Sequence, residues 1–365
     1  MALQTLKLTS FRNIGKANLK TEAKHIFLVG ENGQGKTSLL ESIYMLSYGS
    51  SFRTKNHKDV INNSSAEAIV WGYILSNKEE KRIGIKIGRK EGKRIVVNKK
   101  EIRDRSELIN FSPSITFTHE DLHFLDGSPV QRRTFFDQTL SLFNPSFIDI
   151  LRRYKRILKA RNSVLRNMLF DQVVVYDSLL LAAGIEIQKW REKIIGQFSE
   201  VFRLLCKEVG GIKNANLLYK PSWKKIEKLD DGMEKLLSQR EQDKHFKTTT
   251  TGPHRDDFIM ILGDKRFKAQ GSTGQQRVAS LILRVAQAEF FYKSTKKLPI
   301  LLIDDVLLEL DAKKREAFLK HLPPHQQAFF TFLPDEPYQH YQFEHTNMYK
   351  VKLGQFEQCN MLKNY

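Results

Sequence analysis

The stretch Gly30-Glu31-Asn32-Gly33-Gln34-Gly35-Lys36-Thr37 decides the fold of the chain. It follows a short apolar run at residues 26–29, and it precedes a helical pattern that places Leu39, Ile43 and Leu46 on one face. Strand, loop and helix in this order are the context that the G-x-x-x-x-G-K-[ST] pattern needs before it is interpreted as a phosphate-binding loop. The alternative is a chance glycine-rich turn, and the flanking strand and helix argue against it.

Each residue type in this loop has a physical role. Glycines let backbone N–H groups turn inward around phosphate oxygens, and the helix start adds unpaired N–H groups and a positive dipole end. We expect Lys36 to reach the β- and γ-phosphates and Thr37 to offer its hydroxyl to Mg²⁺. The sequence therefore predicts an ATP and Mg²⁺ site formed by residues 30–37 together with Ser38.

The composition is strongly basic. The 365 residues include 60 lysines and arginines against 41 acids, which gives a formal net charge of +19. This excess favours a polyanionic partner, with nucleic acid ahead of membrane, although lysines spread evenly over a solvated surface would give the same number. Cys206 and Cys359 lie far apart, and no signal peptide or membrane-length apolar stretch is present, so we expect a cytoplasmic protein.

Strand patterns near both ends of the chain enclose a helical middle. They occur at residues 5–9, 68–75, 83–87 and 94–97, and again at 248–251, 258–262, 298–302 and 327–332. The pair at 83–87 and 94–97 flanks a hairpin turn, which predicts a small antiparallel meander with a basic rim. We therefore expect one α/β domain built from residues 1–115 and 246–365, with a mainly helical arm inserted at residues 116–245.

One segment of the arm is basic and amphipathic. No acid occurs between Ile150 and Phe170, while apolar residues form a seam and cations take the other faces. Such a helix fits a phosphate backbone, and it fits equally a solvated face that only happens to be basic. The cations that we expect to contact DNA are Arg152, Arg153, Arg156 and Lys159. In the alternative interpretation, some cations of this segment pair with acids such as Glu186.

A second motif is the apolar run at residues 300–303 followed by Asp304 and Asp305. It places carboxylates at the carboxyl end of a buried strand, where ligands bind in open α/β sheets. We expect Asp304 to hold the Mg²⁺–water shell and Asp305 to orient or deprotonate an attacking water. Alone, the motif would be better explained as surface acids at a strand end, but the phosphate loop favours the catalytic interpretation.

A third motif, Ser272-Thr273-Gly274-Gln275-Gln276-Arg277, opens a helix with a continuous apolar stripe. A helix start of this kind is an anion site, and Ser272 can cap the helix. The string is weak by itself because many helices begin with serine and glycine. Its position before the strand that ends in Asp304 makes it informative.

The three motifs together resemble the ABC-type ATPases. This resemblance implies that Ser272, Gly274 and Gln275 contact the γ-phosphate held by a second copy of the chain, so that ATP is sandwiched in a homodimer. Asp311 matches the loop that crosses such a dimer interface, and Thr331 lies near the family's switch position, where transporters usually have histidine. The segment between Thr37 and Ser272 is longer than in transporter ATPases and lacks the long heptad repeats of SMC or Rad50 proteins.

Further strings narrow the resemblance to the bacterial RecF family. They are 11–13, 30–37, 120–122, 127–129, 132–133, 161–162, 251–257, 272–277 and 302–305. The resemblance implies ATP-dependent dimerisation, slow ATP hydrolysis with Lys36, Asp304 and Asp305 as catalytic residues, and binding of double-stranded, single-stranded and gapped DNA. It also implies work with RecO and RecR in placing RecA at single-strand gaps. Arg12 is expected to contact nucleotide, as in related heads.

Two other functions are compatible with parts of the sequence. The chain resembles an ATPase subunit of a membrane transporter in its three motifs, but the long insertion, the basic balance and Thr331 disfavour that function. A DNA-binding scaffold with a non-hydrolysing nucleotide site would explain the charge, but it would not require the phosphate loop and the paired aspartates together. His254 either senses nucleotide or DNA, or is a structural residue with Arg255 and the adjacent aspartates as partners.

Overall fold

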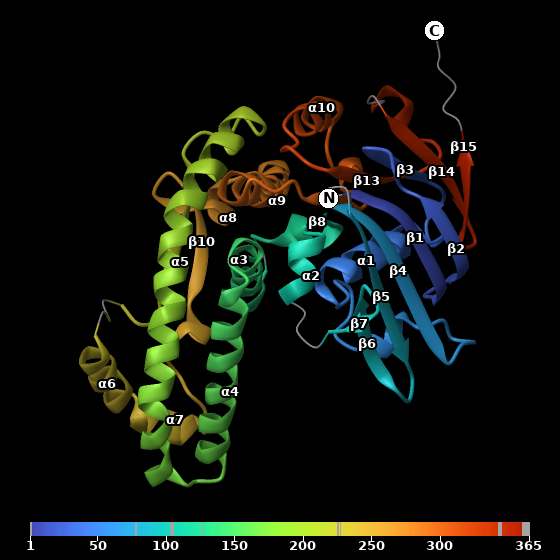
Figure 1. Ribbon diagram of the computed structural model, residues 1–365. Helices are drawn as coiled ribbons and strands as arrows, with labels where there is room; N and C mark the ends of the chain where they lie inside the picture. The colour runs from blue at the N-terminus through green and yellow to red at the C-terminus, as the bar shows by residue number, and fades with distance from the viewer. Residues whose placement is uncertain are drawn as a thin grey trace. The chain divides into compact units, whose positions relative to one another are not determined.

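The computed structural model describes residues 2–76, 79–102, 106–125, 127–224, 226, 228–341 and 345–359. The chain forms two compact units, one of Met1–Asp121 with Phe291–Tyr365 and one of Leu122–Phe290 (Figure 1). Residues 246–290, which we expected in the α/β domain, cluster with the helical unit. Within the described residues no helix has the length and apolarity needed to cross a bilayer.

The first unit contains a six-stranded mixed sheet with strands from both ends of the chain. Its order is β15-β14-β3-β13-β12-β8, and β3, β13, β12 and β8 run parallel. Figure 1 shows the blue β3 between the red β13 and β14. The bounds are β3 His25–Val29, β8 Ser114–Phe117, β12 Ile300–Ile303, β13 Gln327–Phe332, β14 Thr346–Lys352 and β15 Gln355–Cys359. This confirms the prediction of one α/β domain made from both chain ends.

A second sheet of this unit is fully antiparallel, in the order β2-β1-β4-β5-β6-β7. The strands are β1 Ala2–Phe11, β2 Ile14–Lys20, β4 Glu67–Ser76, β5 Glu79–Gly88, β6 Gly92–Val97 and β7 Lys100–Glu101. Buried Leu6 and Leu8 alternate with exposed Lys7 and Thr9 along β1, as they do in a sheet with one face on the core. The predicted meander and its hairpin between β5 and β6 are confirmed.

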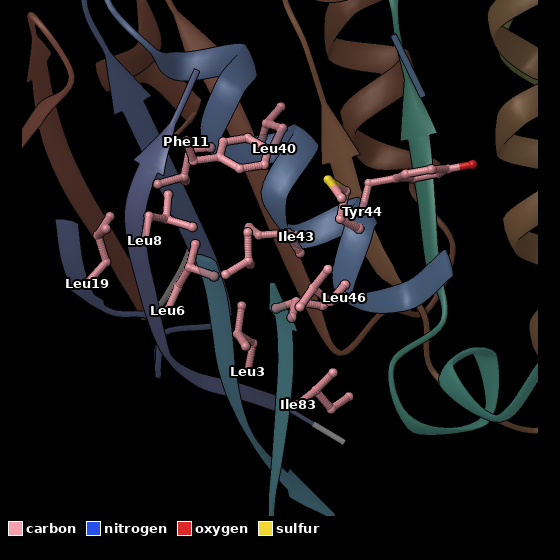
Figure 2. Close-up of a cluster of buried hydrophobic side chains, with 14 of the residues drawn as sticks. Leu3, Leu6, Leu8, Phe11, Leu19, Leu40, Ile43, Tyr44, Leu46 and Ile83 are labelled. Atoms are coloured by element: carbon pink, nitrogen blue, oxygen red, sulfur yellow. The ribbon is translucent and has the colours of Figure 1, made fainter. Parts of the chain in front are cut away.

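The core of the first unit lies between the antiparallel sheet and α1, Lys36–Tyr48. Figure 2 shows Leu3, Leu6 and Leu8 of β1 gathered with Ile43 and Leu46 of α1. Helix and sheet approach closely, since a Cβ added at Gly72 of β4 would lie 2.5 Å from Leu46. The other helices of this unit are α2 Ser106–Phe111 and α10 Ala312–Lys320, with 3₁₀ turns at His57–Val60, His119–His123, Val306–Glu309 and Tyr338–Tyr341.

The second unit is mainly helical, as the sequence predicted. Its helices are α3 Pro129–Phe143, α4 Ser146–Arg166, α5 Val174–Glu208, α6 Leu229–Ser238, α7 Arg240–Phe246, α8 Phe267–Gln270 and α9 Thr273–Thr295, with 3₁₀ turns at Phe170–Val173 and Pro253–Arg255. The last residues of α9 belong to the first unit. Ser128 caps α3 in a capping box with Gln131, which explains where that helix begins.

A three-stranded sheet in this unit was only partly predicted. Its order is β11-β10-β9, with β9 Ala215–Lys220, β10 Asp257–Leu262 and β11 Lys265–Arg266. The sequence predicted β10 but not β9, which lies in a region that we expected to be helical. The predicted strand at residues 248–251 is wrong. Its backbone bonds side chains instead of a strand, because Thr249 N–H donates to Asn162 Oδ1 and Thr250 N–H to Asp243 Oδ1, each at 2.8 Å.

An ion cluster that is fully buried ties α4, α5 and α7 together. The Arg161 guanidinium bonds Asp177 at 2.9 Å and Asp243 at 2.6 Å, and all three side chains are inaccessible to solvent. Arg240 also pairs with Asp177, at 2.5 Å. Arg161 is therefore a structural cation rather than part of the basic surface of α4.

His254 has hydrogen-bond partners other than those expected. One ring nitrogen lies 2.8 Å from the Tyr154 hydroxyl and the other 2.9 Å from the carbonyl of Thr249. Burial lowers the pKa of His254 to about 4, so the ring is neutral at pH 7.

The buried cluster predicts a large stability difference between two arginines of α4. Arg161→Ala leaves Asp177 and Asp243 buried without their shared cation, and we expect it to lower the free energy of unfolding by about 3–5 kcal/mol. The matched control is Arg156→Ala, an exposed position on the same helix, where we expect a change within about 0.5 kcal/mol. Urea unfolding followed by circular dichroism measures both, and equal stabilities would contradict the assignment.

Candidate functional site

The predicted phosphate loop connects β3 to α1 in the first unit. Gly33 and Gly35 adopt φ values of 77° and 118°, which favour glycine. A Cβ at Gly30 would lie 2.3 Å from the backbone oxygen of Val351, so that position tolerates only glycine. Gln34 holds the loop in place, because its side chain accepts from Leu353 N–H at 2.6 Å and its carbonyl accepts from Gly354 N–H at 2.8 Å.

Lys36 lies inside the loop rather than on the surface. Its side chain Nζ donates to the carbonyls of Gly30 at 2.6 Å and Glu31 at 3.3 Å, and the residue is only 3% exposed. The ammonium is thus held by two backbone carbonyls of the loop. A cation held in this way is suited to bind the anionic oxygens of a phosphate chain.

Four side chains from three segments meet beside the loop. Thr37 Oγ1 donates to Asp304 Oδ1 at 3.0 Å, so the phosphate loop and the end of β12 are in direct contact. The Thr331 hydroxyl, at the carboxyl end of β13, lies 2.7 Å from Asp305 Oδ1 and 3.3 Å from Asp304 Oδ1. It also accepts from the backbone N–H of Asp305 at 2.8 Å. The sequence predicted the residues of this group, but not that Thr331 bridges both aspartates.

The environment of Asp304 changes its acidity. Burial raises the pKa of its carboxyl to about 6, and the neighbouring Asp305 carboxylate acts in the same direction, while hydrogen bonds from Thr37 and Thr331 oppose the rise. A carboxylate that is costly to ionise in isolation gains the most from a nearby cation. Because Thr37 and Asp304 present hard oxygen atoms 3.0 Å apart, they fit a site for Mg²⁺.

A cavity of about 620 Å³ opens over the loop. It is lined by Glu31, Asn32, Gly33, Gly35, Lys36, Thr37, Ser38, Arg12 and Asp305, all predicted site residues. It is also lined by Asn13, Arg53, Asp59, Ile61, Asn62 and Asn63, which the sequence analysis did not assign to the site. The signal for Asn13 was its place directly after Arg12, and the others lie in the polar stretch that follows α1.

Arg12 and Asn13 lie in the turn after β1, and Asn13 contacts the phosphate loop. The Arg12 guanidinium bonds both oxygens of the buried Glu41, at 2.7 and 3.0 Å, and donates to the carbonyl of Asp59 at 2.7 Å. Asn13 donates to the carbonyl of Gly33 and accepts from the Ser38 hydroxyl, each at 3.0 Å. Arg12 thus lines the cavity while its planar group is held rigidly by Glu41.

The residues of the third sequence motif lie at the start of α9, in the second unit. The Ser272 hydroxyl accepts from Gln275 N–H at 3.3 Å, and Gln275 Oε1 accepts from Ser272 N–H at 2.9 Å, a reciprocal capping box. Ser272, Gly274 and Gln275 are all exposed. The cap predicted for Ser272 is present, and the exposure leaves this helix start accessible to another molecule.

Asp311 begins α10 and is also exposed. It caps the helix by accepting from Lys314 N–H at 2.9 Å, and it pairs with the Lys314 ammonium at 2.7 Å. Hydrogen bonding from Lys314 lowers the pKa of this carboxyl.

The four arginines and lysines that we expected to contact DNA are exposed on α4. Two of them form ion pairs at the surface, Arg152 with Asp149 at 3.0 Å and Arg153 with Glu186 at 2.6 Å. Arg156 and Lys159 present their charges to solvent. All four stay predicted DNA contacts, because surface ion pairs are weak and leave their cations exposed.

Comparison with known proteins identifies the family. The model of the RecF/RecN/SMC N-terminal domain matches residues 2–353. A DNA replication and repair protein RecF of Treponema pallidum is 37% identical over 346 residues, which cover 94% of this chain and 98% of the relative. The chain belongs to the RecF family. A RecF of Leptospira interrogans is 33% identical over 346 residues, covering 93% of this chain and 94% of that protein.

Solved structures agree with this assignment of the RecF family. A structure described as the recombination mediator protein RecF with ATP in the RecFOR pathway superimposes with a TM-score of 0.89 at 25% identity, over 98% of both chains. An SMC head bound to a domain of ScpA gives a TM-score of 0.56 at 12% identity, which shows a shared fold. The predicted fold class, an ABC-type ATPase head with an inserted arm, is confirmed.

The raised pKa of Asp304 predicts a pH-dependent stability. The pKa of Asp304 is about 6 in the folded chain and 3.8 for a free aspartate side chain. Ionising Asp304 therefore lowers the free energy of unfolding, and this loss grows as the pH rises from about 4 to 6. Asp304→Asn should therefore raise the free energy of unfolding without nucleotide at pH 7.5, by up to roughly 3 kcal/mol, and have no effect near pH 4. Urea unfolding at the two pH values measures this difference.

The control is Asp311→Asn, where the sign is reversed. The pKa of Asp311 is lowered, so its carboxylate stabilises the fold at pH 7.5 and the amide should be slightly less stable there. If the Asp304→Asn chain were less stable than the wild type at pH 7.5, ionised Asp304 would not destabilise the fold, and the prediction would be wrong.

Proposed function

We propose that this chain is an ATP-binding, ATP-hydrolysing switch of DNA replication and repair that dimerises on DNA. The observation that carries the proposal is the contact of Thr37 with Asp304, beside Asp305 and Thr331, at the mouth of an intact phosphate loop. The RecF relative described with ATP supports ATP as the ligand, since it covers nearly the whole chain. Nothing but nucleotide chemistry requires these groups together.

In the bound state, the loop would hold the phosphate chain and Lys36 would exchange its carbonyl partners for phosphate oxygens. Thr37 and Asp304 would hold Mg²⁺, which supplies charge neutralisation on the phosphates when bound. Asp305 is the general base that orients the attacking water. Thr331 positions that base, because its hydroxyl fixes both the carboxylate and the backbone N–H of Asp305.

The second half of each site would come from a partner copy. Ser272, Gly274 and Gln275 lie exposed at a helix start, where unpaired N–H groups and the dipole favour an anion such as the γ-phosphate. Asp311 is likewise exposed and would lie at the dimer interface. ATP would therefore join two chains, and hydrolysis would separate them.

The net charge of +19 supports DNA as the partner of the closed dimer. The proposed substrates are double-stranded DNA, single-stranded DNA and the junctions of gaps. The RecFOR pathway named for the ATP-bound relative supports RecO and RecR as partners. We propose RecA as the protein placed downstream, as the resemblance to the RecF family implies. DNA-dependent hydrolysis is slow in this proposal, because hydrolysis sets the lifetime of the dimer and does not drive transport.

Two substitutions separate nucleotide binding from hydrolysis. Lys36→Met removes the only positive charge among residues 30–37, and we expect it to abolish ATP binding and dimerisation. Asp305→Asn removes the general base, and we expect hydrolysis to fall about 100-fold or more while the ATP-bound dimer persists longer. Light scattering with ATP, followed over time, measures dimer lifetime. Unchanged lifetime in the Asp305 variant would reject its role as base.

A third substitution tests the partner's contribution. Ser272→Arg places a bulky cation on the exposed start of α9, and we expect it to prevent ATP-dependent dimerisation while ATP binding to each monomer is kept. Ser272→Asn, which keeps a capping side chain, separates loss of the cap from blocking of the interface. If both variants bound ATP and dimerised like the wild type, the shared site would be wrong.

A further inference from the structure

The antiparallel sheet of the first unit has one face that the core does not use. Residues of β1, β4 and β5 alternate, so Leu6, Leu8 and Ile83 point to the core and their neighbours point away from it. The outward residues form rows across the sheet: Asn18, Lys7, Trp71, Gly84 and Val96; Lys20, Thr5, Tyr73 and Arg82; and Lys16, Thr9, Ile69, Lys86 and Arg94. We call these three rows the outer face.

Aromatic and cationic groups are layered at the middle of the outer face. The Arg82 guanidinium lies 3.9 Å from the centre of the Trp71 ring and 5.4 Å from that of Tyr73. Lys7 lies over Tyr73 at 5.2 Å from the ring centre. The two rings are half-buried, so each keeps part of its surface in solvent.

Gly84 explains how the Trp71 ring is held. A Cβ at this glycine would lie 2.2 Å from the indole, so the ring lies directly on the backbone of β5. Glycine within a strand costs stability, and its presence is consistent with a place where another group must approach the backbone closely. The result is a flat indole fixed against the sheet, with a planar guanidinium stacked above it.

Positive charge surrounds this centre. Lys7, Lys16, Lys20 and Arg94 are exposed on the outer face, while Lys86 pairs with Glu67 at 2.7 Å. Two exposed acids adjoin the outer face: Glu80, opposite Leu75, lies beside the row of Arg82, and Glu101, opposite Val96, ends the row of Trp71. Neighbouring strands lie about 4.8 Å apart, so the cations of β2 and β6 flank the aromatic centre on both sides.

We propose that the outer face binds single-stranded DNA, with bases stacking on Tyr73 and on the Trp71–Arg82 pair and with the flanking lysines and arginines contacting phosphates. Unpaired bases expose flat surfaces that stack on aromatic rings and guanidinium planes, whereas bases within a duplex do not. Flat aromatic groups on a sheet, bordered by cations, are therefore suited to single strands. This inference rests on the proposed DNA-binding function and assigns a surface to it.

The test compares DNA affinities of variants by fluorescence anisotropy, with a labelled oligonucleotide of about 15 thymidines and a labelled duplex of equal length. Tyr73→Ala and Arg82→Ala should each weaken binding of the single strand by about 5-fold or more, and change binding of the duplex by less than about 2-fold. Trp71→Leu, which keeps an apolar cover over Gly84, should act in the same direction. ATP binding, whose site lies in the same unit, should be unchanged and reports that the unit is folded.

Phe246→Ala is the matched control, because it removes an aromatic ring that is 62% exposed in the second unit. It should leave single-strand affinity unchanged. Equal losses on single strand and duplex would show a purely electrostatic surface and overturn the stacking proposal, as would unchanged affinities in all three variants. A wild-type chain that binds neither probe would instead overturn the proposed DNA-binding function.

Discussion

The site depends on one constraint, the meeting of two adjacent carboxylates with two threonine hydroxyls at the end of a parallel sheet. Thr37 bonds Asp304, and Thr331 bonds both Asp304 and Asp305. The two threonines come from segments almost 300 residues apart in sequence, on α1 and β13. Parallel strands make this possible, because β3, β12 and β13 all end at the same edge. The raised pKa of Asp304 shows that its carboxyl is harder to ionise when it is buried beside Asp305.

Much of the head was predictable because its signals are local. The phosphate loop, the strand before Asp304 and the helix after Ser272 each carry a pattern within a few residues, and each forms the element that was expected. What the sequence missed depends on distant partners. β9 is a strand because it pairs with β10, and residues 248–251 are not a strand because Asn162 and Asp243 take their N–H groups.

The same reasoning separates cations that look alike in sequence. Arg161 and Arg156 occupy one basic helix, but Arg161 is buried between two aspartates while Arg156 is exposed. Arg12 similarly has its charge balanced by Glu41, and Arg82 is stacked on an indole ring. Net charge indicates a polyanionic partner, but only burial and pairing identify which cations remain for it.

The most direct test of the shared site is to mix two inactive variants. Lys36→Met keeps an intact helix start at Ser272, and Ser272→Arg keeps an intact phosphate loop. If each site is built from two chains, a mixed dimer contains one complete site, and ATP hydrolysis should reappear on mixing, at most at about half of the wild-type rate per dimer. A mixture as inactive as its two components would contradict a site completed by a second copy.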